Sequence, residues 1–508
     1  MNPLNLSVPQ QHDFTDPTVE RDVARLRDWL SNLPLMDVVE TVRLVHAALN
    51  ALNEQKLDHA QRFQYLEIYR ITVMRLFVTL DPLHLRQLSL SKTQRQEAIK
   101  GLAELFLSMA SGYKLIVMLL YRSLVPGKQA PELFGLAINR ALEQLGYALL
   151  DSYRFYRTSQ PFMIAESHAL YRVARHHGLL DSSIPDADDP QSALTTAMLY
   201  HTIMLLSLAD PSRLAEGEVA LLFDVLLQHA NECRIIPGNQ WADNGAGLFL
   251  VDLQADAPPE PCTGLKSPAP AQEPYLLDAR EALANVRERL SSTPAKVRMQ
   301  SPEAMLLRRL LPEAQGDGAR REQRLPDSRH AALLLGLENI HRHLMTASAS
   351  QQGDAGPGTS LAAACTVLDS SKGGMKLVCG SGETGDACVG NLLAILEGEA
   401  GARTLLLAMI RSLQVQPDGG MEIGVQVMPG GLGPVFCSSP DEHEQAVHAL
   451  FMPAKEAEET GATLIAAKGF YESRRHLLID VGGKEIRAQA GRLVVDSPVF
   501  DRFEFSAL

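Results

Sequence analysis

Three residues suited to binding a nucleotide base stand at fixed spacing in CTVLDSSKGGMKLVC, residues 365–379: Asp369, Ser371 and Gly374. An Asp carboxylate accepts hydrogen bonds from the N–H groups of a base edge, and a Ser hydroxyl donates or accepts. A Gly lets the backbone approach a ligand, or takes a positive φ in a turn. The same residue types are ordinary in hairpin turns, and a D-x-S-x-x-G match arises by chance in roughly one chain in ten of this length. The motif therefore needs support from elsewhere in the chain.

Arginines gather upstream of this segment. Arg320 and Arg324 form R-x-x-x-R, and two guanidinium groups at this spacing can hold phosphates through forked hydrogen bonds and stack on purine faces. The alternative is a solvated basic surface, because Arg21 and Arg25 match the same pattern in the first predicted helix. The arginines between 308 and 329 are Arg308, Arg309, Arg320, Arg321, Arg324 and Arg329.

The order of the two motifs is more specific than either motif alone. R-x-x-x-R followed by D-x-S-x-x-G, at the start of a small β domain, resembles the PilZ domain family, which binds the bacterial second messenger cyclic di-GMP. The resemblance implies a six-stranded antiparallel barrel with a later strand of Gly and alternating apolar residues, and IGVQV at 423–427 fits that strand. The resemblance to this family covers about residues 320–437. The gap between the motifs is longer than is typical, so either 336–358 is inserted or the first strand is displaced.

The resemblance implies a role for each motif. The arginine pair would clamp the phosphates and stack on guanine, and the hairpin motif would line the guanine and phosphate side. Arg321 is an additional candidate without an assigned place in the family pattern. Lys372 and Lys376 either add positive charge near this site or are exposed strand lysines. The predicted cyclic di-GMP site therefore consists of Arg320, Arg321, Arg324, Asp369, Ser371 and Gly374.

Other patterns with chemical potential are weak. The glycines of 380–385 match G-x-G-x-x-G, but this stretch joins two predicted strands, whereas a dinucleotide fingerprint needs a strand followed by a helix. His176 and His177 are adjacent and diverge on a helix, and Glu166 and His168 lack the H-E-x-x-H context of a zinc site. The sequence contains no P-loop and no G-x-S-x-G. We therefore predict a protein that is not an enzyme and has no metal or cofactor.

Composition restricts the class of protein. A length of 508 residues predicts more than one domain. A net charge of −13 argues against bulk binding to nucleic acid or anionic membrane, although it allows a local basic pocket. The apolar run 105–121 has Lys114 at its middle and is typical of a core helix rather than a membrane span. We find no signal peptide at the start, and the six cysteines lack C-x-x-C spacing. The predicted location is therefore the cytoplasm.

The pattern is helical over about 17–239, with apolar residues at i, i+3 and i+4 spacing but no strict repeat period. A strand at 247–253 closes this part. The segment 252–274 is rich in Pro, Ala and Glu, which is typical of a linker, and helices are expected over 276–292 and 301–314. We therefore predict a helical domain over 1–255, and a linker with connector helices over 256–315.

Alternating apolar residues predict strands from 363 onward. A PilZ-like barrel is expected over 316–440, with 434–437 as its last strand. A C-terminal β extension follows over 441–508, with a helix over 441–452 and short strands at 484–489 and 492–497. This extension is either a small β unit or a second barrel without the motifs. The predicted fold class is thus α+β multidomain: an all-α N-terminal domain, an antiparallel barrel and a further β unit.

The predicted function is a cyclic di-GMP receptor that couples the second messenger to a protein partner through the helical domain. The resemblance implies a role in bacterial motility or surface attachment. Closure of the arginine segment over the ligand would reorient the barrel. The alternative is a scaffold or assembly protein whose degenerate barrel binds only protein. An enzyme would need a pocket with perturbed carboxylates or histidines, which this sequence does not indicate.

Overall fold

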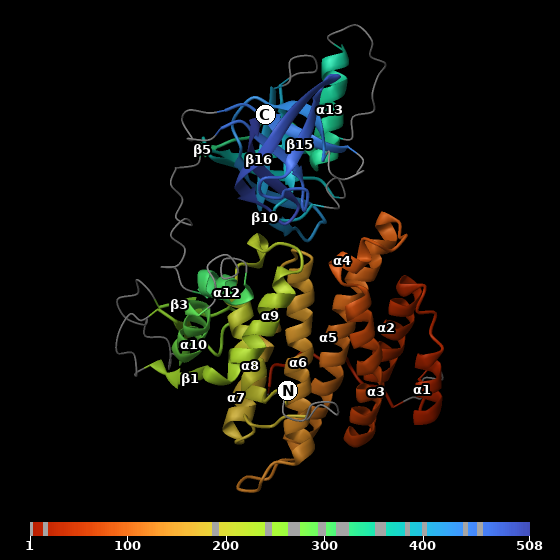
Figure 1. Ribbon diagram of the computed structural model, residues 1–508. Coiled ribbons are helices and arrows are strands. Elements are labelled where there is room, and N and C mark those ends of the chain that lie inside the picture. Colours follow the sequence, from red (N-terminus) through yellow and green to blue (C-terminus); the bar gives the residue numbers. More distant parts are fainter. Residues whose placement is uncertain are drawn as a thin grey trace. The chain divides into compact units, whose positions relative to one another are not determined.

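The computed structural model divides into two compact units. The first comprises residues 1–211 and 216–319, and the second comprises 212–215 and 320–508. Helical ribbons make up most of the first unit and strands most of the second (Figure 1). The structure describes residues 4–13, 19–184, 193–238, 246–262, 275–292, 301–310, 325–350, 362–381, 387–398, 404–439, 446–454 and 461–508.

The first unit is mostly α-helical, as the sequence predicts. Several helices begin at an Asp or Ser side chain that accepts a backbone N–H of the first turn, which satisfies a donor that the helix itself leaves unpaired. The helices are α1 (Val23–Ser31), α2 (Val38–Glu54), α3 (His59–Thr79), α4 (Pro82–Leu85), α5 (Lys92–Ser123), α6 (Glu132–Arg154), α7 (Met163–His176), α8 (Thr196–Leu208) and α9 (Glu218–His229).

The longest of these helices, α5, lies in the core and contacts α2, α3 and α6. Its residues Phe106, Met109 and Ile116 have no exposed surface. Of the described helices, α5 alone is long and apolar enough to cross a membrane, but 72% of its apolar window is buried inside the protein. The helix therefore packs as a core element of this unit.

A four-stranded antiparallel sheet completes the first unit, in the order β1-β4-β2-β3. The predicted linker over 256–315 is instead part of this unit, because β3 and β4 belong to the sheet and α12 contacts α9. The helix predicted over 276–292 begins only at Arg280, since the preceding residues pair between β1 and β2. The elements are β1 (Arg234–Pro237), β2 (Leu248–Val251), β3 (Glu260–Pro261), β4 (Tyr275–Asp278), α10 (Arg280–Ser291) and α12 (Pro302–Leu310).

The second unit begins with a six-stranded antiparallel barrel, which confirms the predicted fold. The strands pair in the order β7-β6-β9-β10-β11-β8, and β8 pairs back with β7 to close the ring. Val367, Leu377 and Ile423 lie in its interior with at most 1% of their surface exposed. The strands are β6 (His330–Leu335), β7 (Ala363–Ser370), β8 (Gly374–Cys379), β9 (Leu392–Glu397), β10 (Thr404–Val415) and β11 (Met421–Val427), and a short β5 (Leu325–Pro326) precedes them.

A helix inserted between β6 and β7 accounts for the long gap between the two motifs. Gly336 ends β6 with a φ of 86°, which a residue with a side chain adopts only with strain. The chain then forms α13 (Leu337–Ser350) before it returns to β7. The described part of 336–358 thus forms an additional helix between two strands of the barrel. The helix packs against β12 and β13 of the next barrel.

The C-terminal part is a second closed barrel, in the order β12-β13-β14-β17-β16-β15. Cys437, Leu464 and Phe503 fill its interior and have no exposed surface. Apolar residues of both barrels and α13, among them Leu407 and Leu450, form one shared cluster. The strands are β12 (Gly433–Ser438), β13 (Val447–Met452), β14 (Thr463–Ala467), β15 (His476–Val481), β16 (Lys484–Asp496) and β17 (Phe500–Ala507).

Three details of the predicted C-terminal part are wrong. The strand at 434–437 belongs to the second barrel, so the boundary between the barrels lies between 427 and 433. The predicted helix over 441–452 is replaced at its described end by β13, because Val447–Met452 pairs with both β12 and β14. The two short strands predicted at 484–489 and 492–497 form one continuous strand, β16.

Candidate functional site

The predicted hairpin around 369–374 is present, formed by β7 and β8. Ser371 closes its turn: the backbone N–H donates to the carbonyl of Gly374 at 2.8 Å, and the hydroxyl donates to the same oxygen at 3.3 Å. The strand β7 extends to Ser370. Asp369 therefore lies on the end of a strand rather than in the turn.

A β-bulge sets the position of Asp369. The register of β7 on β8 shifts between Val367 and Asp369, so Leu368 has no partner on β8. Bulges raise the local twist and re-aim side chains, and they occur often beside functional sites. Asp369 pairs with Lys376 across the hairpin and is half-buried. The strand therefore fixes the backbone at Asp369, and the residue stays partly accessible to solvent.

The arginine motif ends directly before a strand that pairs with this hairpin. Leu325 of β5 is the antiparallel partner of Ser370, and Pro326 is the partner of Asp369. Arg320, Arg321 and Arg324 lie outside the described residues, so their roles stay predictions. The pairing nevertheless brings the residue that follows Arg324 next to the D-x-S-x-x-G motif.

Asp327 links the two segments and was not predicted from the sequence. Its carboxylate accepts the hydroxyl of Ser370 at 3.1 Å and the Nε of Arg329 at 2.8 Å. Burial opposes its ionisation, but the hydrogen bonds from Arg329, Ser328 and Ser370 together lower the pKa of Asp327. Arg329 also contacts Glu397 at 3.2 Å. This arginine of the upstream cluster is thus held in ion pairs beside the hairpin.

The residues IGVQV form part of a strand, β11, and this strand pairs with β8. Gln426 pairs with Gly374, and the N–H of Val427 donates to the carbonyl of Gly373 at 3.1 Å. The end of β11 therefore supports the glycines of the motif. On the same pair of strands, the Nζ of Lys376 lies 2.6 Å from a carboxylate oxygen of Glu422. Lys376 is thus ion-paired rather than a free cation.

Gly424 permits close packing between β11 and β10. A Cβ at this position would lie 2.3 Å from the hydroxyl oxygen of Ser412, which is shorter than any normal contact. A side chain at the start of the alternating run would therefore force the Ser412 hydroxyl of the neighbouring strand to move. Its role is to let the strands beside the hairpin approach each other.

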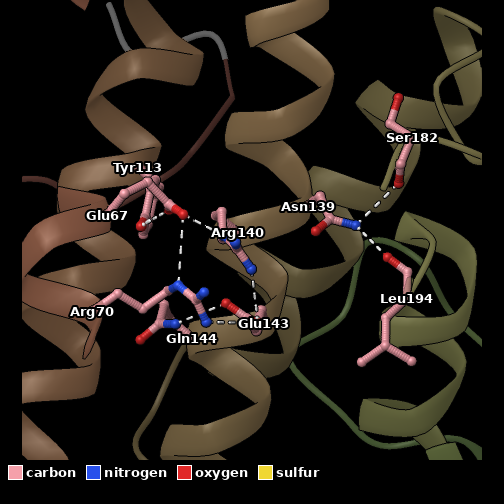
Figure 2. A network of polar contacts seen from close by, with 9 residues as sticks. All are labelled: Glu67, Arg70, Tyr113, Asn139, Arg140, Glu143, Gln144, Ser182 and Leu194. Atoms are coloured by element: carbon pink, nitrogen blue, oxygen red, sulfur yellow. Dashed lines mark hydrogen bonds and ion pairs between the residues drawn. The ribbon is translucent and has the colours of Figure 1, made fainter. Parts of the chain in front are cut away.

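A network of polar side chains in the helical unit joins α3, α5 and α6, and Figure 2 shows its residues. The carboxylate of Glu67 accepts the hydroxyl of Tyr113 at 2.5 Å and two guanidinium nitrogens of Arg140 at 3.0 Å. Arg140 also bonds Glu143 at 2.9 Å. Burial, and then the Glu67 carboxylate, raises the pKa of Tyr113. Since both carboxylates are engaged by arginine, the network holds helices together and offers no free acid or base.

The other sequence candidates do not assemble into a site. Among the described residues, no group of three or more His, Cys, Asp or Glu side chains is placed to hold a metal ion. His168 is buried and its Nδ1 lies 2.8 Å from the Tyr200 hydroxyl. Burial lowers the pKa of His168 to about 4, so the ring is neutral near pH 7 and acts as a packed core residue. All six cysteines are buried free thiols.

Two protein-family models match this chain, one in its N-terminal part and one at its C-terminal end. Residues 24–239 match the model described as the N-terminal domain of the cyclic-di-GMP receptor FimW, and residues 437–508 match the FimW C-terminal beta-barrel domain. The two matches lie on either side of 240–436, which contains the first barrel. The cyclic-di-GMP receptor FimW of Pseudomonas aeruginosa is 24% identical over 581 residues, covering 99% of this chain and 93% of that protein. The chain is thus similar to a cyclic-di-GMP receptor from end to end, and its helical unit and second barrel match the two corresponding FimW domains.

Proposed function

We propose that this protein is a cyclic-di-GMP receptor and that the ligand binds on the first barrel, at the hairpin of β7 and β8. The observation that carries the proposal is the pairing of Leu325 with Ser370, because it brings the residue that directly follows R-x-x-x-R to the D-x-S-x-x-G motif. The end-to-end similarity to FimW supports the same ligand.

The chemistry of the motif residues fits this ligand. Asp369 would accept hydrogen bonds from the N–H groups of a guanine edge, and Ser371 would contact it through a hydroxyl. Gly374 lets the ligand approach the backbone. Arg320 and Arg324 would hold the phosphates through their forked donors and stack on guanine, with Arg321 beside them.

The finer assignment is to a PilZ-type site. A closed ring of six antiparallel strands supports it, with R-x-x-x-R directly before β5 in the sequence and D-x-S-x-x-G at the hairpin of β7 and β8. On this proposal the protein acts in the bacterial cytoplasm by binding, without catalysis. The helical unit would contact a protein of the motility or surface-attachment machinery, and ligand binding would alter that contact.

Isothermal titration calorimetry of the full chain with cyclic di-GMP tests the proposal. The expected result is saturable binding at micromolar ligand that is weakened by Arg324→Ala and by Asp369→Ala. Arg487→Ala is a matched control, since Arg487 is exposed on β16 of the second barrel. Absence of heat at micromolar ligand, or undiminished affinity in both motif variants, would contradict the proposed function and favour a scaffold that binds only protein.

A further inference from the structure

Arg411 lies on β10 at a second bulge, facing the end of β11. The register of β10 on β11 shifts between Ile410 and Ser412, which leaves Arg411 without a paired residue on β11. Its guanidinium group reaches Gln426, where Nε and Nη2 both donate to the same amide oxygen at 2.8 and 2.6 Å. The bulge and the amide together fix the direction of this arginine.

Gln426 connects Arg411 to the hairpin motif. It is the cross-strand partner of Gly374, the last residue of D-x-S-x-x-G. The next residue, Val427, donates its N–H to the carbonyl of Gly373. Neighbouring strands lie about 4.8 Å apart, so Gln426 lies one strand spacing from Gly374 while its amide holds the guanidinium group of Arg411.

The charge of Arg411 is not balanced locally. The neighbouring cations Lys376 and Arg329 are paired with carboxylates, whereas Arg411 forms no ion pair with any residue in the described ranges. A guanidinium group stays protonated in proteins. An amide oxygen accepts its hydrogen bonds without neutralising its charge. An exposed cation with a fixed direction therefore lies beside the motif in a protein of net charge −13.

The contacts to Gln426 leave part of the guanidinium group unused. Arginine has five N–H donors, and the amide oxygen takes one on Nε and one on Nη2. The remaining donors on Nη1 and Nη2 form a fork. Such a fork matches two acceptors side by side, either two oxygens of a phosphate or the O6 and N7 of a guanine. Cyclic di-GMP carries both kinds of acceptor pair.

We propose that Arg411 is a further ligand-binding residue of this site, and that Gln426 is the residue that positions it. The inference rests on the proposed function and extends it to a third and a fourth strand, β11 and β10. Arg411 contacts bound cyclic di-GMP through its free fork, on the side of the hairpin that β5 does not occupy.

Calorimetric titration of the full chain with cyclic di-GMP tests this role through a graded series. Arg411→Ala removes the fork and is expected to weaken binding by about 10- to 100-fold, as for the loss of hydrogen bonds to a charged group. Arg411→Lys keeps the charge but not the fork, so an intermediate loss is expected. Gln426→Leu removes the amide that holds the Arg411 side chain, so the affinity should fall a few-fold. Arg487→Ala should leave the affinity unchanged.

The outcomes separate this inference from the proposed function. If the unmodified chain binds and Asp369→Ala weakens binding, but Arg411→Ala and Arg411→Lys both bind as tightly as the unmodified chain, Arg411 is not a ligand contact. If the unmodified chain does not bind, the proposed function itself fails. Thermal unfolding of each variant identifies loss of folding. If Arg411→Ala does not fold, the affinities of Arg411→Lys and Gln426→Leu decide whether Arg411 contacts the ligand.

Competition with cyclic di-AMP identifies which acceptor pair the fork contacts. A guanine contact predicts that Arg411→Ala reduces the preference for cyclic di-GMP over cyclic di-AMP, because adenine lacks the O6 acceptor. A phosphate contact predicts that the variant loses affinity for both ligands by the same factor.

Discussion

Leu325 and Ser370 are antiparallel partners on β5 and β7. Arg324 precedes Leu325 in the sequence, and Ser370 lies within D-x-S-x-x-G. The helix α13 separates the two motifs along the chain, but the pairing brings Leu325, the residue that follows the arginine motif, to within one strand spacing of the hairpin motif, about 4.8 Å. The ligand site that we propose depends on this relationship.

The first prediction concerns Asp369, which lies at the bulge of β7. Asp369→Ala removes the carboxylate that would accept the N–H groups of guanine, and binding of cyclic di-GMP should weaken by about 1–3 kcal/mol. Calorimetry gives the dissociation constant. Glu485→Ala is the control, because Glu485 is an exposed acid in the second barrel. Equal affinities for the two variants would mean that Asp369 does not contact the ligand.

The second prediction concerns the contact between Gly424 and Ser412. A side chain at 424 would collide with the Ser412 hydroxyl, so Gly424→Ala should lower stability by about 1–3 kcal/mol through overpacking. The double variant Gly424→Ala/Ser412→Gly removes the colliding atom and should recover part of the loss. Thermal or urea unfolding measures both changes.

Gly433→Ala provides the matched control for this substitution. A Cβ at Gly433 would meet no atom within 4 Å, so its effect on stability should be small. If Gly433→Ala and Gly424→Ala are equally destabilising, backbone effects of alanine, rather than the contact with Ser412, explain the loss. If Ser412→Gly brings no recovery, strand β10 is not the source of the constraint.

Local patterns were sufficient for the hairpin and for much of the barrel, because alternating apolar residues and glycine turns are local properties. They failed where pairing partners decided the structure. Tyr275–Asp278 continues into a helical pattern, yet it is a strand because β1 and β2 flank it. Val447–Met452 is equally ambiguous by spacing, and β12 and β14 make it a strand.

The candidate site shows the same division. A sequence motif predicts Asp369, Ser371 and Gly374. Only the pairing register of the strands identifies Asp327 and Arg411. Asp327 reaches the site because β5 pairs with β7, and Arg411 reaches it because a bulge turns it toward Gln426. Cross-strand neighbours are distant in sequence, so no local pattern identifies them.

The third prediction concerns Asp151 on α6, which has no exposed surface. Neither of its carboxylate oxygens has a hydrogen-bond partner in the described part of the chain, and the nearest charge is Arg154 at 3.9 Å. Burial raises the pKa of Asp151 to about 7, against the opposing effect of Arg154 and Arg157. In the unfolded chain an Asp titrates near 3.9. The folded protein therefore retains this proton to a higher pH than the unfolded chain does.

Because the folded state binds the extra proton, Asp151 makes stability fall as pH rises from about 4 to 7, and its effect is constant above that range. Asp151→Asn cannot ionise, so it should raise the free energy of unfolding at pH 8 by up to about 4 kcal/mol. At pH 5 the gain should be smaller. Urea unfolding at both pH values measures this, with exposed Asp28→Asn as the control. An equal effect of Asp151→Asn at pH 5 and pH 8 would contradict the prediction.

The fourth prediction concerns the buried ion pair between Lys114 of α5 and Glu166 of α7. Their charged atoms lie 2.8 Å apart, with 3% and 2% of the side chains exposed. Glu166 also accepts the backbone N–H and the hydroxyl of Ser7, each at 2.5 Å. The pair therefore fixes the N-terminal segment to two helices. It also explains how a lysine is accommodated in the core of the longest helix of this unit.

Removing one partner leaves the other charge buried without compensation, so Lys114→Met should lower the free energy of unfolding by about 3–5 kcal/mol. The double variant Lys114→Met/Glu166→Leu removes both charges, and most of that loss should be recovered, although the Ser7 donors then lack an acceptor. Lys100→Met on the same helix is the control, since its pair with Glu104 is largely exposed and such pairs contribute about 0–1 kcal/mol. Urea unfolding of the four proteins measures the series. A double variant no more stable than Lys114→Met would mean that the destabilisation comes from packing around position 114, and not from an isolated carboxylate.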